Sequence, residues 1–169
     1  MRRINIDALV SPHARIYTDS IVVGKHCRID DGAILTGDIV LGDYVHIGPY
    51  CVLTGGGGIR IGDYTGIAAF TSVLTASDDF SGRSMVNPCI PDEYKPHMSK
   101  GKVSIGKNVL IGSHTVIMPG VVIGDGASVG AHSLVKHDCQ SDYLYGGVPA
   151  KQIRKKSMEI WGLTKEFEQ

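Results

Sequence analysis

Aliphatic residues recur at every sixth position along most of this chain, and the spacing predicts the fold. An α-helix would return its apolar face every three or four residues and a plain strand would alternate every second residue, so neither fits a period of six. Short strands separated by corners do fit, and three such segments close a triangular coil of about 18 residues. The fifteen positions of the series are Val23, Ile29, Leu35, Leu41, Ile47, Leu53, Ile61, Ile67, Val73, Ile105, Ile111, Ile117, Ile123, Val129 and Val135.

The residues around each aliphatic position support stacked coils. Glycine follows eight of the fifteen and allows a tight corner, while small or β-branched residues such as Ala33, Thr65 and Ser133 lie four places after the aliphatic residue. Coils of this kind stack about 4.8 Å apart and bury their aliphatic side chains on one another. We therefore expect an all-β solenoid domain over residues 1–150, with a first coil that begins near Val10 and Ile16 and a two-residue slip in the glycine run at 55–58.

The series of sixes is interrupted once, and the interruption is a candidate functional loop. Residues 77–102, SDDFSGRSMVNPCIPDEYKPHMSKGK, are polar and rich in proline. Loops that leave a repeat fold usually carry function, so we expect an excursion from the solenoid here. Stacking also predicts a column of rings on one outward face, which is either a subunit interface or the wall of a site. The column comprises Tyr50, Phe70, His114 and His132.

The C-terminal residues follow a different pattern. Ile153, Ile160, Trp161 and Phe167 recur near helical spacing. This predicts an amphipathic helix over residues 151–168, within a C-terminal extension of 151–169, that covers an end of the solenoid or a neighbouring molecule.

Composition excludes several classes of partner. Seventeen basic and seventeen acidic residues cancel, and neither sign forms a run, so we expect no nucleic-acid partner. No stretch approaches the roughly 18 apolar residues of a membrane span, and no signal peptide is recognisable, so a cytoplasmic location is expected. The four cysteines form no CxxC pair, which indicates packing thiols in a reducing compartment.

Two segments resemble a known family. IGKNVLIGSHTVIMPGVVIGDGASVGAHSLV and YLYGGVPAKQIRKKS resemble the hexapeptide-repeat acyltransferases, and the resemblance covers residues from about 10 to 156. It implies a left-handed parallel β-helix, a homotrimer with sites between subunits, and acetyl-CoA as the donor. It also implies an acceptor hydroxyl or amine on a sugar or a nucleotide-linked sugar, such as a precursor of a cell-surface polysaccharide.

The resemblance extends to a candidate base. Galactoside and xenobiotic acetyltransferases use a histidine in the corresponding loop to deprotonate the acceptor, and counting without gaps from IRIGDYTGIAAF places Asp78 there. An ordinary carboxylate is a weak base, so burial or the adjacent charge of Asp79 has to strengthen it. Alternatively His97 or His114 supplies an imidazole suited to neutral pH. We expect Asp78 first and His114 second.

For the donor, the resemblance points to six positions. Ser113 and the backbone of Gly130 and Ala131 would contact pantetheine. Lys136, Lys151 and Arg154 would contact the phosphates, to which charged donors bind well. Family members often have Thr-Lys where this chain has Lys136 and His137, which is a departure from the pattern.

Two other functions share this kind of fold. γ-Type carbonic anhydrases hold zinc with three histidines, and His97, His132 and His137 have a superficially suitable spacing. These three occupy different places in the repeat, so no metal site is predicted. A non-catalytic assembly module is the third reading, although it would require neither the polar loop nor the GGVPAK segment. Cys89 as an acyl carrier lacks an identified base partner.

Overall fold

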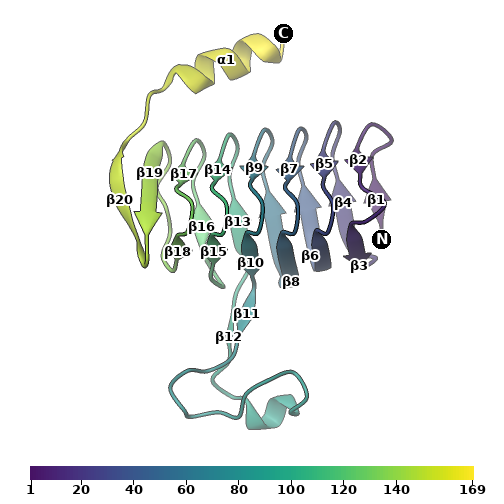
Figure 1. Cartoon of the computed structure of the whole chain (residues 1–169), viewed down its shortest axis with the longest axis vertical. Helices are drawn as coiled ribbons and strands as arrows, with labels where there is room; N and C mark the ends of the chain where they lie inside the picture. The colour runs from purple at the N-terminus through teal and green to yellow at the C-terminus, as the bar shows by residue number, and fades with distance from the viewer.

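The computed structural model describes residues 1–169, most of which form a three-sided prism of short parallel strands (Figure 1). The prism is a left-handed parallel β-helix, as the repeat and the family resemblance predict. The larger sheet comprises β1 (Arg3–Ile4), β3 (Arg15–Tyr17), β4 (Ile21–Val23), β6 (Ile34–Leu41), β8 (Val52–Ile61), β10 (Ser72–Leu74), β13 (Val103–Ile105), β15 (Val116–Ile117), β16 (Val122–Ile123) and β18 (Leu134–Val135). The second sheet comprises β2 (Leu9–Val10), β5 (Arg28–Ile29), β7 (His46–Ile47), β9 (Gly66–Ile67), β14 (Leu110–Ile111), β17 (Ser128–Val129), β19 (Tyr143–Gly147) and β20 (Ala150–Lys155).

Strand register confirms the period of the coil. Ile29 pairs with Ile47, 18 residues later, whereas Ile47 pairs with Ile67 because the glycine run adds two residues. Ile67 then pairs with Ile111 across the interruption, so the coil resumes in register after it. All fifteen aliphatic positions of the series lie in one buried core. Each buried side chain of this kind stabilises the fold by about 1.5–3 kcal/mol relative to an exposed one.

Three corners separate the three flat sides of the prism. The first corner has His26, Tyr44, Tyr64 and Asn108 at its turns, the second has Tyr50, Phe70, His114 and His132, and the third has Gly37, Gly120 and the excursion. The residues of the second corner have φ between 55° and 60°, in the left-handed region. The predicted ring column therefore exists, but it runs along a corner and not on a flat face, because the fourth residue of each hexad makes the bend.

The excursion leaves the prism at the third corner, as expected. β11 (Ala76–Ser77) and β12 (Ser99–Lys100) form an antiparallel ribbon at its base, and the short 3₁₀ helix η1 (Asp92–Tyr94) lies in its outer part (Figure 1). Gly57 makes room for this base, since a Cβ there would lie 3.1 Å from the Gly101 carbonyl oxygen. The glycine run and the excursion are thus two parts of one departure from the regular coil.

The predicted C-terminal helix is wrong in its first half. β20 runs antiparallel to β19 and covers the last coil, and α1 (Glu159–Phe167) begins only afterwards. The reason is that β19 would otherwise end the sheet with unpaired backbone groups, and the turn between Gly147 and Ala150 returns the chain to pair with them. The first coil also begins earlier than expected, because β1 already pairs with β4.

α1 lies along the first corner of its own chain. Trp161 Nε1 donates to Asp142 Oδ1 over 2.8 Å, and the Phe167 ring meets the edge of Tyr44 with centroids 5.1 Å apart. Lys156 Nζ donates to the Gly126 carbonyl over 2.7 Å just before the helix begins. No helix of this protein is long and apolar enough to cross a bilayer.

Candidate active site

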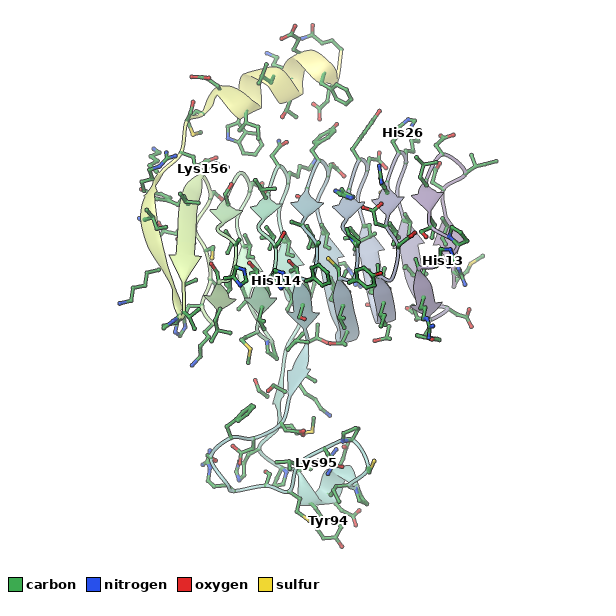
Figure 2. All side chains as sticks on the ribbon, viewed as in Figure 1. His13, His26, Tyr94, Lys95, His114 and Lys156 are labelled. Carbon is green, nitrogen blue, oxygen red and sulfur yellow. The ribbon has the colours of Figure 1, made fainter.

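A continuous stack of rings follows the second corner. Tyr50 and Phe70 have centroids 5.3 Å apart, Phe70 and His114 are 4.8 Å apart, and His114 and His132 are 4.7 Å apart. The planes of neighbouring rings are within 10° of parallel, and all four side chains reach the surface. Stacking in successive coils holds the His114 imidazole between Phe70 and His132, which is the last ring of the column. His114 is therefore an exposed, oriented imidazole in the middle of a surface column (Figure 2).

Three of the predicted donor-binding residues lie beside His114. Ser113 precedes it at the corner, and its carbonyl accepts the N–H of His132 over 2.9 Å. Gly130 and Ala131 form the same corner one coil later. The two backbones approach closely, since a Cβ on Gly112 would lie 2.4 Å from Ala131 N. Beside the rings of this corner, Ser113, Gly130 and Ala131 offer polar backbone groups with only small side chains, which suits an extended chain such as pantetheine.

The three predicted cations are dispersed toward the C-terminal end of the prism. Gly146 lies next to Gly130, since its Cα would be 4.0 Å from a Cβ on Gly130. Lys151 pairs with Gly146 in the β19–β20 register, so Lys151 follows the same corner one layer further on. Arg154 lies further along β20, and Lys136 follows β18 at the third corner. All three side chains are exposed. Within one chain, Lys151 therefore lies near Ser113 and Gly130 on the second corner, whereas Lys136 lies on the third corner.

Asp78 lines a small hollow inside the excursion. The hollow has a volume of about 170 Å³ and is lined by Ala76, Ser77, Asp78, Pro88, Lys95 and Met98. Asp78 Oδ2 accepts the backbone N–H of Asn87 over 2.9 Å, which fixes the carboxylate. The side chain is half-buried.

The neighbouring Asp79 has a different environment. It accepts hydrogen bonds from the Ser81 hydroxyl, the Ser81 N–H and the Arg83 N–H, each over 2.9 Å. These bonds, that of the Ser81 hydroxyl foremost, lower the pKa of Asp79 to about 2. A carboxylate this acidic is a poor proton acceptor. Asp79 therefore organises the loop, and these contacts make it a weaker base than expected from the sequence.

The histidine candidates do not meet Asp78 within one chain. His97 is exposed in the excursion, where its backbone N–H donates to Ser84 Oγ over 3.0 Å. His114 lies on the second corner, whereas the excursion projects from the third (Figure 2). Bringing Asp78 to the ring column therefore needs a second copy of the chain or a movement of the excursion.

Lys95 is a residue of this hollow that the sequence did not single out. Its side chain is only 4% exposed, and Nζ lies 3.2 Å from Asp92 Oδ1. Nζ also donates to the Asn87 carbonyl over 3.3 Å, so the residue whose N–H holds Asp78 is itself held by a buried cation. The spacing of Asp92 and Lys95, three residues apart just before a proline, was the available signal.

The histidines of the zinc alternative lie apart. His97 is in the excursion, His132 is on the second corner and His137 is on the third. No group of three His, Cys, Asp or Glu side chains in the chain is placed to hold a metal ion. The geometry of one chain therefore gives the carbonic anhydrase reading no support.

Comparison with known proteins identifies the family. The model of the bacterial transferase hexapeptide (six repeats) matches residues 20–55 and 102–137. The chain is 36% identical over 162 residues, 94% of its length and 84% of the relative's, to dTDP-4-amino-4,6-dideoxy-D-glucose acyltransferase from Escherichia coli.

Solved structures agree over nearly the whole chain. A point mutant of AntD, an N-acyltransferase from Bacillus cereus, in complex with dTDP-4-amino-4,6-dideoxyglucose and coenzyme A, matches with a TM-score of 0.95 and 42% identity, covering 98% of this chain and 89% of AntD. AntD in complex with dTDP and 3-hydroxybutyryl-CoA matches with a TM-score of 0.94 and 43% identity, covering 96% and 87%. The repeat, the prism and these full-length matches show that the chain belongs to the hexapeptide-repeat family of acyltransferases.

Proposed function

We propose that this protein transfers an acyl group from an acyl-CoA thioester to the amino group of a dTDP-linked amino-deoxy sugar. One observation carries the proposal: the likeness to AntD extends over 98% of the chain and includes the excursion as well as the prism. Acetyl is the acyl group that the family resemblance implies. Since AntD was solved with 3-hydroxybutyryl-CoA, a larger acyl group is the alternative to test.

The chemistry is a direct transfer in a ternary complex. The amine lone pair attacks the thioester carbonyl, the new C–N bond forms, the C–S bond breaks, and coenzyme A leaves as a thiolate that gains a proton. An amine attacks readily once it is neutral, so the protein needs one group to accept a proton. Asp78 takes this role in the proposal, with His114 second. Polar donors at the second corner would stabilise the oxyanion.

The donor would lie along the second corner on the C-terminal side of His114. Ser113, Gly130 and Ala131 would contact pantetheine there. Lys151 extends the same line by one layer, and its exposed ammonium has no ion-pair partner. Arg154, and Lys136 from a neighbouring prism, would then contact the phosphates of coenzyme A.

A homotrimer is part of the proposal. The ring column and the excursion occupy different corners of one prism, and the excursion presents apolar side chains to solvent, with Phe80 92% exposed and Tyr94 54% exposed. Neighbouring prisms would bring the Asp78 of one chain to the ring column of another. We place the protein in the cytoplasm, where its four free cysteines stay reduced.

The test uses purified protein with dTDP-4-amino-4,6-dideoxyglucose and either acetyl-CoA or 3-hydroxybutyryl-CoA. Release of coenzyme A thiol that depends on the acceptor, together with an amide product detected by mass spectrometry, is the expected result. The ratio of the two kcat/KM values shows which of the two acyl groups the protein prefers. No thiol release with either donor would overturn the proposal, and light scattering of the same sample tests the trimer.

A further inference from the structure

Three adjoining hollows line the second corner at the N-terminal end of the prism. They have volumes of about 450, 510 and 290 Å³, and all three share Asp31. Arg28 and Asp30 line two of them, and Arg15 and Tyr50 line the third. We call this continuous surface the N-terminal hollow. It contains none of the residues predicted to act in catalysis or donor binding.

A hydrogen-bond network around Asp30 borders the N-terminal hollow, which Arg28 and Asp30 line. The Asp30 side chain is 16% exposed, and its two oxygens accept from Arg28 Nε over 2.6 Å and from His46 Nε2 over 2.7 Å. Burial alone would raise the pKa of Asp30, but these hydrogen bonds outweigh it and the pKa is lowered. Arg28 and His46 are register partners on β5 and β7. The network therefore holds the Arg28 guanidinium in one orientation at the corner.

The fixed guanidinium has unused donors. Arg28 contacts Asp30 through Nε alone, so its two terminal nitrogens make no hydrogen bond within the chain. Arg15 makes no ion pair, and its guanidinium donates only to Tyr17 Oη over 3.3 Å. Planar guanidinium groups with free terminal nitrogens are well suited to phosphate oxygens. The guanidinium groups of Arg28 and Arg15 line adjoining hollows that share Asp31. Two such groups side by side suit the two phosphates of a diphosphate.

Asp31 adds a group suited to a nucleoside. Its Oδ1 accepts the Ser11 hydroxyl, and Oδ2 makes no hydrogen bond within the chain. A carboxylate oxygen fixed in this way accepts a ribose hydroxyl or a ring N–H. Phosphate alone would be repelled by it, so the surface favours a ligand with both a diphosphate and a neutral hydrogen-bonding part.

The ring column joins the N-terminal hollow to His114. Tyr50 lines the hollow and stacks on Phe70 at 5.3 Å, and Phe70 stacks on His114 at 4.8 Å. His114 thus lies two ring spacings from the edge of the hollow, about the length of a sugar attached to a diphosphate. The expected donor residues continue from His114 in the opposite direction. Acceptor and donor would therefore meet at His114 from opposite ends of one corner.

We propose that the N-terminal hollow binds the nucleoside diphosphate part of the acceptor, with Arg28 and Arg15 on the diphosphate and Asp31 on the nucleoside. The proposal rests on the proposed function, since it assumes a nucleotide-linked acceptor. It assigns recognition of the nucleotide to a surface distinct from the excursion that carries Asp78.

Calorimetry with dTDP tests the assignment, using wild-type protein, Arg28→Gln, and Arg2→Gln as a matched control on an exposed arginine outside the hollow. Loss of charge-assisted hydrogen bonds should weaken dTDP binding by about tenfold or more in Arg28→Gln and leave it unchanged in Arg2→Gln. Acetyl-CoA titrated into the same three proteins should bind equally. Pyrophosphate binding should weaken with dTDP binding, whereas thymidine binding should respond to Asp31→Asn.

The outcomes separate the two proposals. If wild type and Arg28→Gln bind dTDP equally while acetyl-CoA also binds, the N-terminal hollow is not the nucleotide site and the proposed function stands. If wild type binds acetyl-CoA but not dTDP, the acceptor class and the hollow assignment both fail. Binding of neither ligand overturns the acyltransferase proposal itself. Equal thermal midpoints of the three proteins establish that Arg28→Gln is folded, and Arg15→Gln provides a second, independent variant.

Discussion

Replacing Asp78 with asparagine removes one carboxylate from the excursion and little else. The asparagine Oδ1 can still accept the N–H of Asn87, which Asp78 accepts over 2.9 Å. The side chain is half-buried in a hollow that Lys95 also lines, and the two residue types have nearly the same volume. The excursion should therefore keep its fold, and any loss of turnover reports on the chemistry of the carboxylate.

The expected loss follows from the role of a proton acceptor. General base catalysis by a positioned side chain contributes about a hundredfold to ten-thousandfold to the rate, which corresponds to about 2.7–5.4 kcal/mol of transition-state stabilisation. We expect kcat of Asp78→Asn to fall within this range. KM should change little, since the residue is not expected to bind either substrate in the ground state.

The assay follows release of coenzyme A thiol from acyl-CoA at saturating dTDP-4-amino-4,6-dideoxyglucose. Asp19→Asn is the matched control, because Asp19 is exposed at the third corner in the first coil and makes no side-chain hydrogen bond. Its kcat should equal that of wild type. A kcat of Asp78→Asn within twofold of wild type would refute the reasoning, and a large loss in His114→Gln instead would assign the proton to the imidazole.

Three further predictions concern the fold and the excursion. Thr65→Val should lower the free energy of unfolding in urea by about 2–4 kcal/mol, because the buried Thr65 hydroxyl donates to the Gly106 carbonyl and accepts the Val109 N–H. Thr36→Val is the control, since Thr36 is half-buried and its hydroxyl makes no such bonds. Since the pKa of Asp79 is lowered to about 2, its hydrogen bonds should persist above pH 4 and be lost as the pH falls through about 2, as carboxyl NMR shifts would report; a midpoint near 4 would contradict this. A thiol reagent at neutral pH should label one cysteine per native chain, the exposed Cys89. The other three thiols, Cys27, Cys51 and Cys139, are buried, and burial raises their pKa, that of Cys139 to about 11. Labelling of more than one cysteine would contradict this packing.

The prism was predictable because its pattern is local and repeated. Each aliphatic residue of the series is buried, and the small residues four places later, such as Ala33 and Ser133, are buried with them. Stacking by 18 residues also predicted which rings would meet. The corner position of those rings was missed, because hexad spacing alone does not reveal which residue takes the left-handed backbone conformation.

The C-terminal strand could not be read in the same way. Ile153 suggested a helix by its spacing to Ile160, yet in the structure it is 61% exposed on β20. What decides its conformation is the open edge of β19, which exists only after the coils have stacked. A residue pattern over a short segment carries no information about an unpaired edge elsewhere in the fold.

The sequence indicated where to look for a site. The excursion and the ring column drew attention to Asp78 and His114, whose catalytic roles stay predictions, whereas the Arg28 and His46 pair was missed although it obeys the same count of 18. Arg28 and His46 do not belong to the aliphatic series, so a search based on that series does not find them. Lys95 required the fold of the excursion itself, which has no repeat to guide a prediction.

The bends of the prism have a consequence for how such a chain can change. Ring residues at the first and second corners adopt a left-handed conformation that costs roughly 1–2 kcal/mol for residues other than glycine, and asparagine tolerates it better, as Asn108 does at the first corner. Stacked rings recover about 0.5–1.5 kcal/mol per pair. Strain and stacking nearly cancel, so exchanging Tyr44 or Phe70 for asparagine alters the surface of an edge with little effect on folding. The edges can therefore acquire new ligands by substitution while the buried series of sixes continues to hold the scaffold.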